Sequence, residues 1–498
     1  MTAGAPFHPG RLVMVDIEGR QLSTAAAEFL RRYHIRAVCL FRKNLGTESE
    51  VKQLTAQLRA VLGPQALIAL DQEGGSVVRA TFLPQAPSAM ALGAAADAAL
   101  AEQVGAAVAR GVRSLGCNWN FAPVLDVNNN PANPVIGDRS FGANPVEVAR
   151  LAGAWMRGAL SERVACCVKH FPGHGDTQVD SHLDLPVVDK SEAELAALEL
   201  LPFHALCQEA PAVMTAHIVY PQLDAEYPAT LSQKILGQLL RGTWRYDGVL
   251  ITDSLVMKAI YDRYGHQRAG VLALQAGADM VMALGAQQEQ LNAIEAIGAA
   301  LDRGMLSQQQ VLRSNARLDA LAARFPSSSS GYAPAQLQHD EQLMRDAWAR
   351  GLTVLGAARP PPRDQPVRVI TQRSVASDGV AEAGLPGARV AALFEGFDVR
   401  VDEVDELSAL DWARVPRDGR FDVLVSNHRA RYGTQARQFR PQLHLALWNP
   451  FQVLDVPAPA VVTWGYAEGA MEALRLWLLG RGDAPGRSPV QLVPLQPA

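Results

Sequence analysis

Short apolar runs alternate with longer amphipathic segments from Arg11 to about Arg324. An apolar run of about four to eight residues is typical of a buried strand, and apolar positions three or four residues apart are typical of a covering helix. The amphipathic segments include 49–62, 98–115, 145–160, 191–209 and 267–276, and several open with a residue that can cap a helix. Eight strands that each precede a helix predict a (β/α)8 barrel of the TIM type more readily than an open doubly wound sheet. The eight candidate strands are 12–17, 37–41, 67–70, 119–127, 164–168, 212–216, 248–252 and 280–283.

A second, smaller domain is predicted after the barrel. The segment 325–334 is rich in Ser, Pro and Gly, which is typical of a linker. We therefore divide the chain into a barrel domain at 1–325, a linker at 326–337 and a C-terminal domain at 338–498. In the last part a helical segment at 338–351 and further apolar runs predict an α/β sandwich. It has no glycine-rich phosphate motif and few clustered ionisable groups, so its sequence predicts nothing beyond a structural role. Its apolar runs are 367–370, 390–393, 397–401, 423–426, 443–448 and 460–464.

Composition narrows the class of protein. Hydrophobic residues make up 48% and charged residues 19% of the chain, and the formal net charge of -4 provides no bulk basicity for nucleic acid. The five cysteines include no C-x-x-C pair, so we expect them to be core residues of a protein from the reducing cytoplasm. Residues 1–11 lack the apolar core of a secretory signal, and no run of about eighteen apolar residues could span a membrane.

Polar and charged residues gather just after the predicted strands. In a (β/α)8 barrel these positions converge on one mouth, where active sites are built. Asp253 closes one apolar run, and a carboxylate there must pair with a cation or take part in chemistry, because burying it alone is costly. A helix cap or a structural ion pair is the alternative for Asp253. Asp71 follows another run in the same way and is expected to accept hydrogen bonds from hydroxyls. The other charged or polar residues at strand ends include Glu73, Arg79, Asp126, Asp138, Arg139 and His217.

The segment from Lys169 to His182 is the densest cluster of ionisable groups, with three histidines, two aspartates and a lysine directly behind the 164–168 run. Such a cluster at the end of a strand predicts an active-site loop. Asp180 and His182 lie two residues apart, so the carboxylate can bond one ring nitrogen and favour a protonated ring that donates a proton. A solvated Asp-Ser-His turn is the alternative.

A metal site competes with this interpretation. Histidine nitrogens and carboxylate oxygens are common ligands, but the chain has no helical H-E-x-x-H pair, and Lys169 beside the would-be ligands opposes a cation. We therefore predict no metal. The residues that could supply ligands are His170, His174, Asp176, Asp180 and His182.

Six ordered motifs closely resemble glycoside hydrolase family 3, and within it the bacterial β-N-acetylglucosaminidases of cell-wall recycling. The Lys169 to His182 segment is the motif most specific to this subgroup. One departure is visible, because the family often carries arginine after the Gly-Gly pair and this chain has Ser76, which leaves any contact of that arginine in doubt. The other motifs are Asp71-Gln-Glu-Gly-Gly75, Asn120-Phe-Ala-Pro-Val-Leu-Asp126, Ile136-Gly-Asp-Arg-Ser-Phe141, Met214-Thr-Ala-His217 and Ile251-Thr-Asp253.

The resemblance implies roles for residues and a reaction without a cofactor. Asp253 is implied to be the nucleophile and His182 the general acid/base, assisted by Asp180. The implied reaction is retaining hydrolysis of terminal β-linked N-acetylglucosamine from cell-wall muropeptides or chitin fragments. The C-terminal domain is then not needed for the proton transfer, because Asp180 and His182 both belong to the barrel. The residues implied to bind the nonreducing sugar are Asp71, Arg79, Arg139, Lys169 and His170.

Three other functions remain open at this point. A phosphorylase would use phosphate instead of water, and a histidine acid/base repels that anion less than a carboxylate would. A metal-dependent hydrolase would lose its activity in a chelator, and a noncatalytic glycan-binding protein would bind chitobiose without consuming it.

Overall fold

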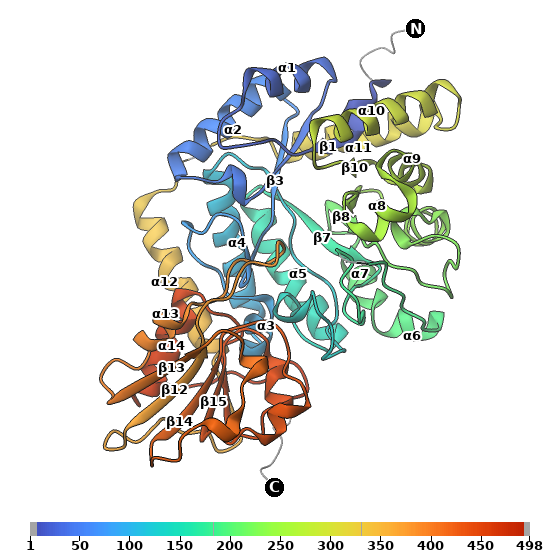
Figure 1. Ribbon diagram of the computed structural model, residues 1–498. Coiled ribbons are helices and arrows are strands. Elements are labelled where there is room, and N and C mark those ends of the chain that lie inside the picture. The colour runs from blue at the N-terminus through green and yellow to red at the C-terminus, as the bar shows by residue number, and fades with distance from the viewer. Residues whose placement is uncertain (1–6, 183, 330, 493–498) are drawn as a thin grey trace.

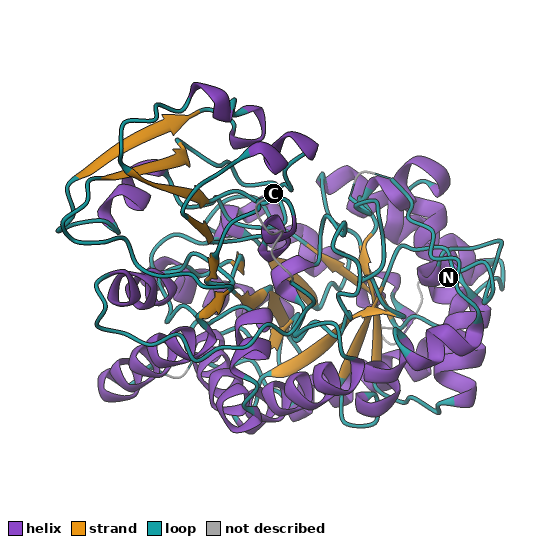
Figure 2. Ribbon diagram, turned by 90° about the horizontal axis from the view of Figure 1, so that it is seen from below, coloured by secondary structure: helices purple, strands orange, loops and turns teal. Residues whose placement is uncertain are grey.

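The computed structural model describes residues 7–182, 184–329 and 331–492. Its first part is a closed barrel of eight parallel strands in the order β1-β10-β9-β8-β7-β6-β3-β2. Helices surround these strands in both views (Figures 1 and 2). The predicted TIM-type barrel is therefore confirmed. The strands are β1 (Val13–Val15), β2 (Ala37–Leu40), β3 (Leu67–Leu70), β6 (Trp119–Asn120), β7 (Ala165–Phe171), β8 (Ala212–Thr215), β9 (Val249–Ser254) and β10 (Met280–Met282).

The barrel strands are covered on both faces, which explains why they read as continuous apolar runs instead of alternating ones. Every residue of β2 and β3 is buried. Several of the covering helices begin at capping residues that the sequence marks; at α2, Thr47 and Glu50 bond reciprocally. The helices are α1 (Thr24–Arg32), α2 (Glu48–Leu62), α3 (Ala89–Ala95), α4 (Ala98–Ser114), α5 (Pro145–Ser161), α6 (Glu192–Ala197), α7 (Leu200–Leu206), α8 (Lys258–Tyr264), α9 (His266–Ala276), α10 (Gln287–Asp302) and α11 (Gln308–Arg324).

Three predicted elements of the barrel domain differ from the observed ones. The 119–127 strand is regular only in β6, and beyond it the chain keeps one bridge, from Val124 to Lys169. The 164–168 strand extends to Phe171, so the first three residues of the predicted loop, 169–171, lie in β7. The single helix predicted at 191–209 is two helices, α6 and α7. Between them Glu199 is buried, and its carboxylate pairs with Lys190.

The C-terminal domain is a six-stranded mixed sheet in the order β11-β16-β15-β14-β12-β13, in which only β11 is antiparallel to its neighbour. Alternate residues of β14 face two different cores: Val423 and Val425 pack on one face and Leu424 on the other. The predicted α/β domain is confirmed. Its elements are α12 (Pro334–Gly351), β11 (Thr353–Leu355), β12 (Val367–Gln372), α13 (Gly387–Ala392), β13 (Val399–Val404), β14 (Phe421–Ser426), β15 (Leu443–Ala446), β16 (Ala460–Val462) and α14 (Glu468–Leu478).

The prediction of a strand at 390–393 is wrong, because most of this segment belongs to helix α13. Val390, Leu393 and Phe394 are buried, and their spacing of three and four residues is helical. The predicted linker at 326–337 also needs a correction, since α12 begins at Pro334. Ser330, within that segment, lies outside the described residues.

Helix α12 joins the two parts of the chain (Figure 1). It packs against α3 and α4 of the barrel and against α14 of the C-terminal domain. Asp340 of α12 is fully buried and receives two hydrogen bonds from Arg110 of α4, at 2.8 and 2.6 Å. Met90 and Ala91 of α3 belong to the same apolar core as the C-terminal sheet, so the two parts share a core. Over the described residues, no helix has the length and apolarity needed to cross a membrane.

Candidate active site

The carboxyl ends of the barrel strands surround a cavity of about 320 Å³. Asp71 follows β3, Lys169 and His170 lie near the end of β7, and Asp253 lies near the end of β9. Every residue that the sequence predicted for the site lines this cavity except Asp180, which bonds to His182. Parallel strands place their ends at one mouth, and this is why positions far apart in the sequence meet. The lining side chains with polar or charged groups include Asp71, Glu73, Arg79, Arg139, Lys169, His170, His182 and Asp253.

Glu73 ties together two of the predicted sugar-binding cations. Its carboxylate accepts hydrogen bonds from Arg139 Nε at 2.9 Å and Nη2 at 2.8 Å. The Lys169 ammonium lies 2.7 Å from both Glu73 and Asp71. Burial acts to raise the pKa of Glu73, but Arg139 and Lys169 outweigh it and hold that pKa well below its usual range. All of these groups are therefore charged, and the cations are fixed in place by two or more partners.

The opposing charges of the lining balance. Asp71, Glu73 and Asp253 carry negative charge, and Arg79, Arg139 and Lys169 carry positive charge. The remaining wall is apolar, with Phe41, Phe121, Met214, Met257 and Met282 among its members. A balanced set of donors and acceptors beside an apolar wall suits a neutral polyhydroxylated ligand, which has both polar edges and apolar faces.

His170 is held by Asp126, a carboxylate with no exposed surface. Asp126 Oδ2 lies 2.7 Å from His170 Nδ1, and its Oδ1 accepts the backbone N–H groups of His170 and His174. Burial acts to raise the pKa of Asp126, but His170 and these hydrogen bonds keep it below its usual range. The ionised Asp126 accepts a hydrogen bond from Nδ1–H, which leaves His170 Nε2 as an acceptor for Arg139, at 3.4 Å, and for a ligand.

The predicted pair of Asp180 and His182 forms as expected. Asp180 Oδ1 lies 2.7 Å from His182 Nδ1 and also accepts the backbone N–H of His182 at 2.9 Å. Burial acts to raise the pKa of Asp180, but the hydrogen bonds and charge of His182 lower it to about 2. With Nδ1 bonded, Nε2 is the nitrogen of His182 that is left to exchange a proton at the cavity.

His174 fastens the loop that carries this pair. Its Nδ1 lies 2.8 Å from Thr177 Oγ1, and its Nε2 lies 2.9 Å from Ser181 Oγ. Burial lowers the pKa of His174 to about 4, so the ring is neutral near pH 7. Ser181 stands between Asp180 and His182, and the buried ring therefore controls where both of them lie.

Asp253 lines the same cavity as His182. Its Oδ1 accepts the backbone N–H of Ser254 at 2.7 Å. Burial acts to raise the pKa of Asp253, but the nearby His217, His170 and His182 rings lower it below its usual range. An ionised carboxylate and a ring with an available nitrogen thus line the same cavity.

The candidate metal ligands are occupied by other partners. Both ring nitrogens of His174 bond to hydroxyls, and Asp176 pairs with Lys190 at 2.7 Å. His170 is bonded to Asp126. Among the described residues, no three His, Cys, Asp or Glu side chains are grouped so that they could hold a metal ion.

The C-terminal domain contributes to the cavity, which its sequence did not indicate. Gly379 and Val380 are part of the lining. They belong to the loop between β12 and α13, which reaches the barrel mouth from the other domain. Sequence reasoning also noted Glu73 and Asp126 at strand ends but assigned them no role, and it considered His174 only as a metal ligand.

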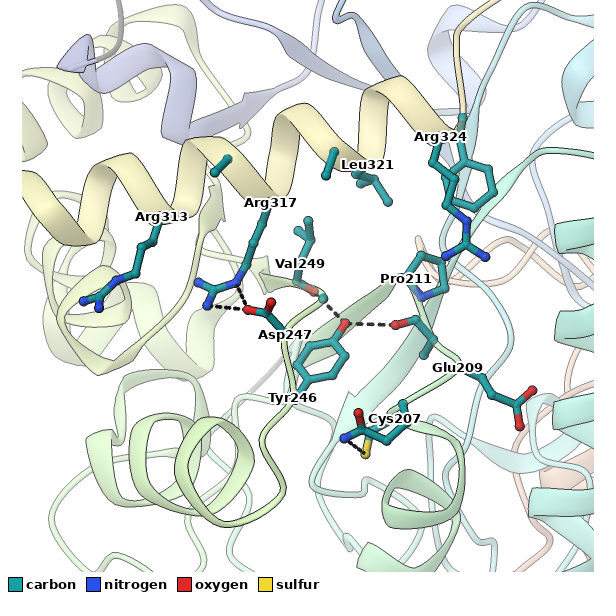
Figure 3. Close-up of a pocket in the computed structure, with 16 residues that line it drawn as sticks. Cys207, Glu209, Pro211, Tyr246, Asp247, Val249, Arg313, Arg317, Leu321 and Arg324 are labelled. Atoms are coloured by element: carbon teal, nitrogen blue, oxygen red, sulfur yellow. Dashed lines mark hydrogen bonds and ion pairs between the residues drawn. The ribbon is translucent and has the colours of Figure 1, made fainter.

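A second cavity, of about 600 Å³, lies at the opposite end of the barrel, where Pro211 and Gly248 precede β8 and β9. Arginine side chains of α11 project toward these loops (Figure 3). Arg317 is already paired with Asp247 at 2.8 Å, and the Tyr246 hydroxyl donates to backbone carbonyls at 3.1 and 3.3 Å. Arg317 and Tyr246 therefore serve the structure, and we take the smaller cavity at the carboxyl ends, where the predicted residues meet, as the candidate active site.

Comparison with known proteins identifies the class to which this fold and site belong. The glycosyl hydrolase family 3 N-terminal domain matches residues 9–321, and the chain belongs to this family. It is similar to a solved family 3 β-N-acetylglucosaminidase from Paenibacillus sp. str. FPU-7, with 33% identity, a TM-score of 0.89 and 99% of each chain covered.

Two curated relatives are named beta-hexosaminidases. The protein from Neisseria meningitidis serogroup C is 38% identical over 286 residues, which cover 56% of this chain and 79% of that protein. Beta-hexosaminidase A from Pseudoalteromonas piscicida is 36% identical over 339 residues, 62% of this chain and 56% of the relative. The chain thus spans just over half the length of the latter protein.

Proposed function

We propose that the protein is a retaining exo-β-N-acetylglucosaminidase that removes terminal β-linked N-acetylglucosamine from cell-wall muropeptides or chitooligosaccharides. The observation that carries the proposal is the single cavity lined by both Asp253 and His182. The names of the Paenibacillus and Neisseria relatives support the same activity.

The reaction proceeds in two displacements. The Asp253 carboxylate attacks the anomeric carbon while His182 Nε2 gives its proton to the departing glycosidic oxygen. The resulting glycosyl ester on Asp253 is then cleaved by a water molecule, which loses its proton to the neutral His182. Asp180 holds Nδ1 and stabilises the imidazolium of the acid form. Because this acid is cationic, it adds no second negative charge beside the nucleophile.

The sugar is held by the charged network of the lining. Asp71 accepts hydrogen bonds from hydroxyl groups. Arg79, Arg139 and Lys169 donate hydrogen bonds to the others, and His170 Nε2 accepts one. Lys169 and Arg139 are already oriented by Glu73, so little reorganisation accompanies binding. We also propose a cytoplasmic location, which is supported by five free and buried cysteines.

The experiment compares chromogenic β-N-acetylglucosaminide with the corresponding β-glucoside, each with and without phosphate. We expect turnover of the N-acetylglucosaminide, release of free sugar in both buffers, and a β-configured first product by NMR. Formation of a sugar 1-phosphate would show that the reaction is phosphorolysis instead of hydrolysis. An α-configured first product would refute the covalent ester on Asp253. Loss of activity in a chelator would favour a metal-dependent hydrolase.

A further inference from the structure

The loop 377–382 of the C-terminal domain supplies most of the hydrogen-bond acceptors for a predicted sugar-binding residue. Arg79 Nη1 donates to the Val380 carbonyl at 2.8 Å and to Glu382 Oε1 at 3.4 Å. Its nearest ionic partner in the barrel is Asp71, at the longer distance of 3.7 Å from Nη2. Arg79 therefore depends mainly on the other domain for its orientation.

Glu382 joins the two domains through both its backbone and its side chain. Its N–H donates to the Ser76 carbonyl at 2.9 Å, and its own carbonyl accepts the Tyr466 hydroxyl at 3.0 Å. Its carboxylate lies between Arg79 and Arg42, with Arg42 Nε at 3.8 Å. On the barrel, this contact is made by Ser76, the residue that stands where the family often carries arginine.

The loop is internally braced. Asp378 Oδ1 accepts the backbone N–H groups of Val380 and Ala381 at 3.0 and 2.7 Å. Its other oxygen pairs with Arg429, which also donates to the Val135 carbonyl of the barrel at 2.5 Å. Gly379 has a φ of +90°, a left-handed conformation that glycine adopts without strain. The Val380 carbonyl is therefore presented to Arg79 by a structured turn.

Arg79 keeps donor capacity for a ligand. The guanidinium has five N–H groups, and its hydrogen bonds to Val380 and Glu382 are both made by Nη1. Arg79 Nε is buried and has no hydrogen-bond partner among the described residues. Arg79 lines the cavity, and Nη2, which lies 3.7 Å from the Asp71 carboxylate, is the donor that we assign to a sugar hydroxyl.

We propose that the loop 377–382 is a positioning element of the sugar site, and that Glu382 acts on substrate binding by orienting Arg79. This inference rests on the proposed function and gives the C-terminal domain a task in it. Glu382 itself is not in the cavity lining, so its effect is transmitted through the guanidinium. The domain then contributes to binding of the sugar while the proton transfer remains with Asp180 and His182.

The test measures kcat and KM for a chromogenic N-acetylglucosaminide in the full-length protein. Glu382→Ala is expected to raise KM about 10-fold with little change in kcat, because a hydrogen bond to a charged group is lost. Glu382→Gln keeps an acceptor oxygen and is expected to restore most of the affinity. The matched control is Glu395→Ala, which removes an exposed carboxylate paired with Arg475 in the same domain.

Two further variants separate positioning from a general structural effect. The double variant Arg79→Lys with Glu382→Ala is expected to lose no more substrate affinity than Arg79→Lys alone. Both substitutions remove the same interaction, the one between Glu382 and Arg79, so their effects do not add. Asp378→Ala loosens the turn without touching the lining and is expected to raise KM as well. An unchanged KM in Glu382→Ala, or additive losses in the double variant, would overturn the inference.

Binding of N-acetylglucosamine, measured by calorimetry, keeps this inference distinct from the proposed function. If the wild type does not hydrolyse the substrate but binds the sugar, the proposed function fails, and a weaker Kd in Glu382→Ala still supports positioning. If the wild type binds no sugar at all, both proposals fail.

Discussion

The contact between Asp126 and His170 gives the most specific prediction. A single atom, Asp126 Oδ2, decides which nitrogen of the His170 ring carries the proton. Asp126 accepts three hydrogen bonds, two of them on Oδ1 from backbone N–H groups and one on Oδ2 from His170 Nδ1. In Asp126→Asn the amide oxygen can keep the two backbone bonds. The amide nitrogen then faces Nδ1 as a donor, so the ring must move its proton to Nε2.

The altered tautomer places two donors against each other, because Nε2 lies 3.4 Å from Arg139 Nη2. The substitution also turns Nε2 from an acceptor into a donor, so a sugar hydroxyl that donates to Nε2 loses its partner, at a cost of about 1–3 kcal/mol. If His170 binds the sugar equally in the ground and transition states, this loss appears in KM, as an increase of about 5- to 150-fold. kcat should change little.

The assay is steady-state kinetics on a chromogenic N-acetylglucosaminide, with thermal unfolding of the same samples to show that the fold is intact. Asp138→Asn is the matched control. That carboxyl is also buried, but it accepts a hydrogen bond from the single backbone N–H of Ser76, at 3.3 Å, which an amide oxygen can accept as well. A wild-type KM in Asp126→Asn would refute the assignment of the tautomer.

Three more predictions concern the same cavity. Asp253→Ala should abolish turnover and leave the thermal unfolding midpoint within a few degrees of the wild type, and an active Asp253→Ala would remove it as the nucleophile. His182→Ala should slow aryl glycosides with poor leaving groups far more than those with good ones, since only poor leaving groups need the proton; equal losses across the series would count against an acid role. Burial lowers the pKa of His174 from 6.5 to about 4, so the unfolded chain binds this proton more readily and stability should fall as the pH drops from 6.5 to about 4, by up to about 3 kcal/mol. Urea unfolding over that range should show a weaker pH dependence in His174→Gln than in the wild type, and identical slopes would contradict the buried neutral ring.

The barrel was predictable because its strands are buried on both faces and its helices are capped by local signals. β2, β3 and β8 lie within the apolar runs that the sequence shows, and α2 starts at its capping box. Local signals failed where a tertiary contact decided the structure. The helical pattern is interrupted at Leu198, beside Glu199, whose buried carboxylate pairs with Lys190. The 390–393 run has strand-like residues but packs as a helix on the C-terminal sheet.

The candidate site was predictable in the same sense. Asp71, Lys169 and Asp253 stand at the ends of apolar runs, and a barrel brings all such ends together. The bond between Asp180 and His182 is local and follows from their spacing. The role of Asp126 could not be inferred, because a carboxylate after a strand gives no sign of which ring it holds.

The sequence by itself determined the strand and helix pattern, the closure of a barrel and the set of ionisable residues at its mouth, since these depend on periodicity and on neighbours within a few positions. Only the tertiary structure decided which cations share Glu73, which ring Asp126 orients and that Val380 and Glu382 reach Arg79 from the second domain. The physical reason is that hydrogen bonds and ion pairs depend on distances of about 3 Å between atoms. The order of residues along a chain does not specify such distances between segments that meet only after folding.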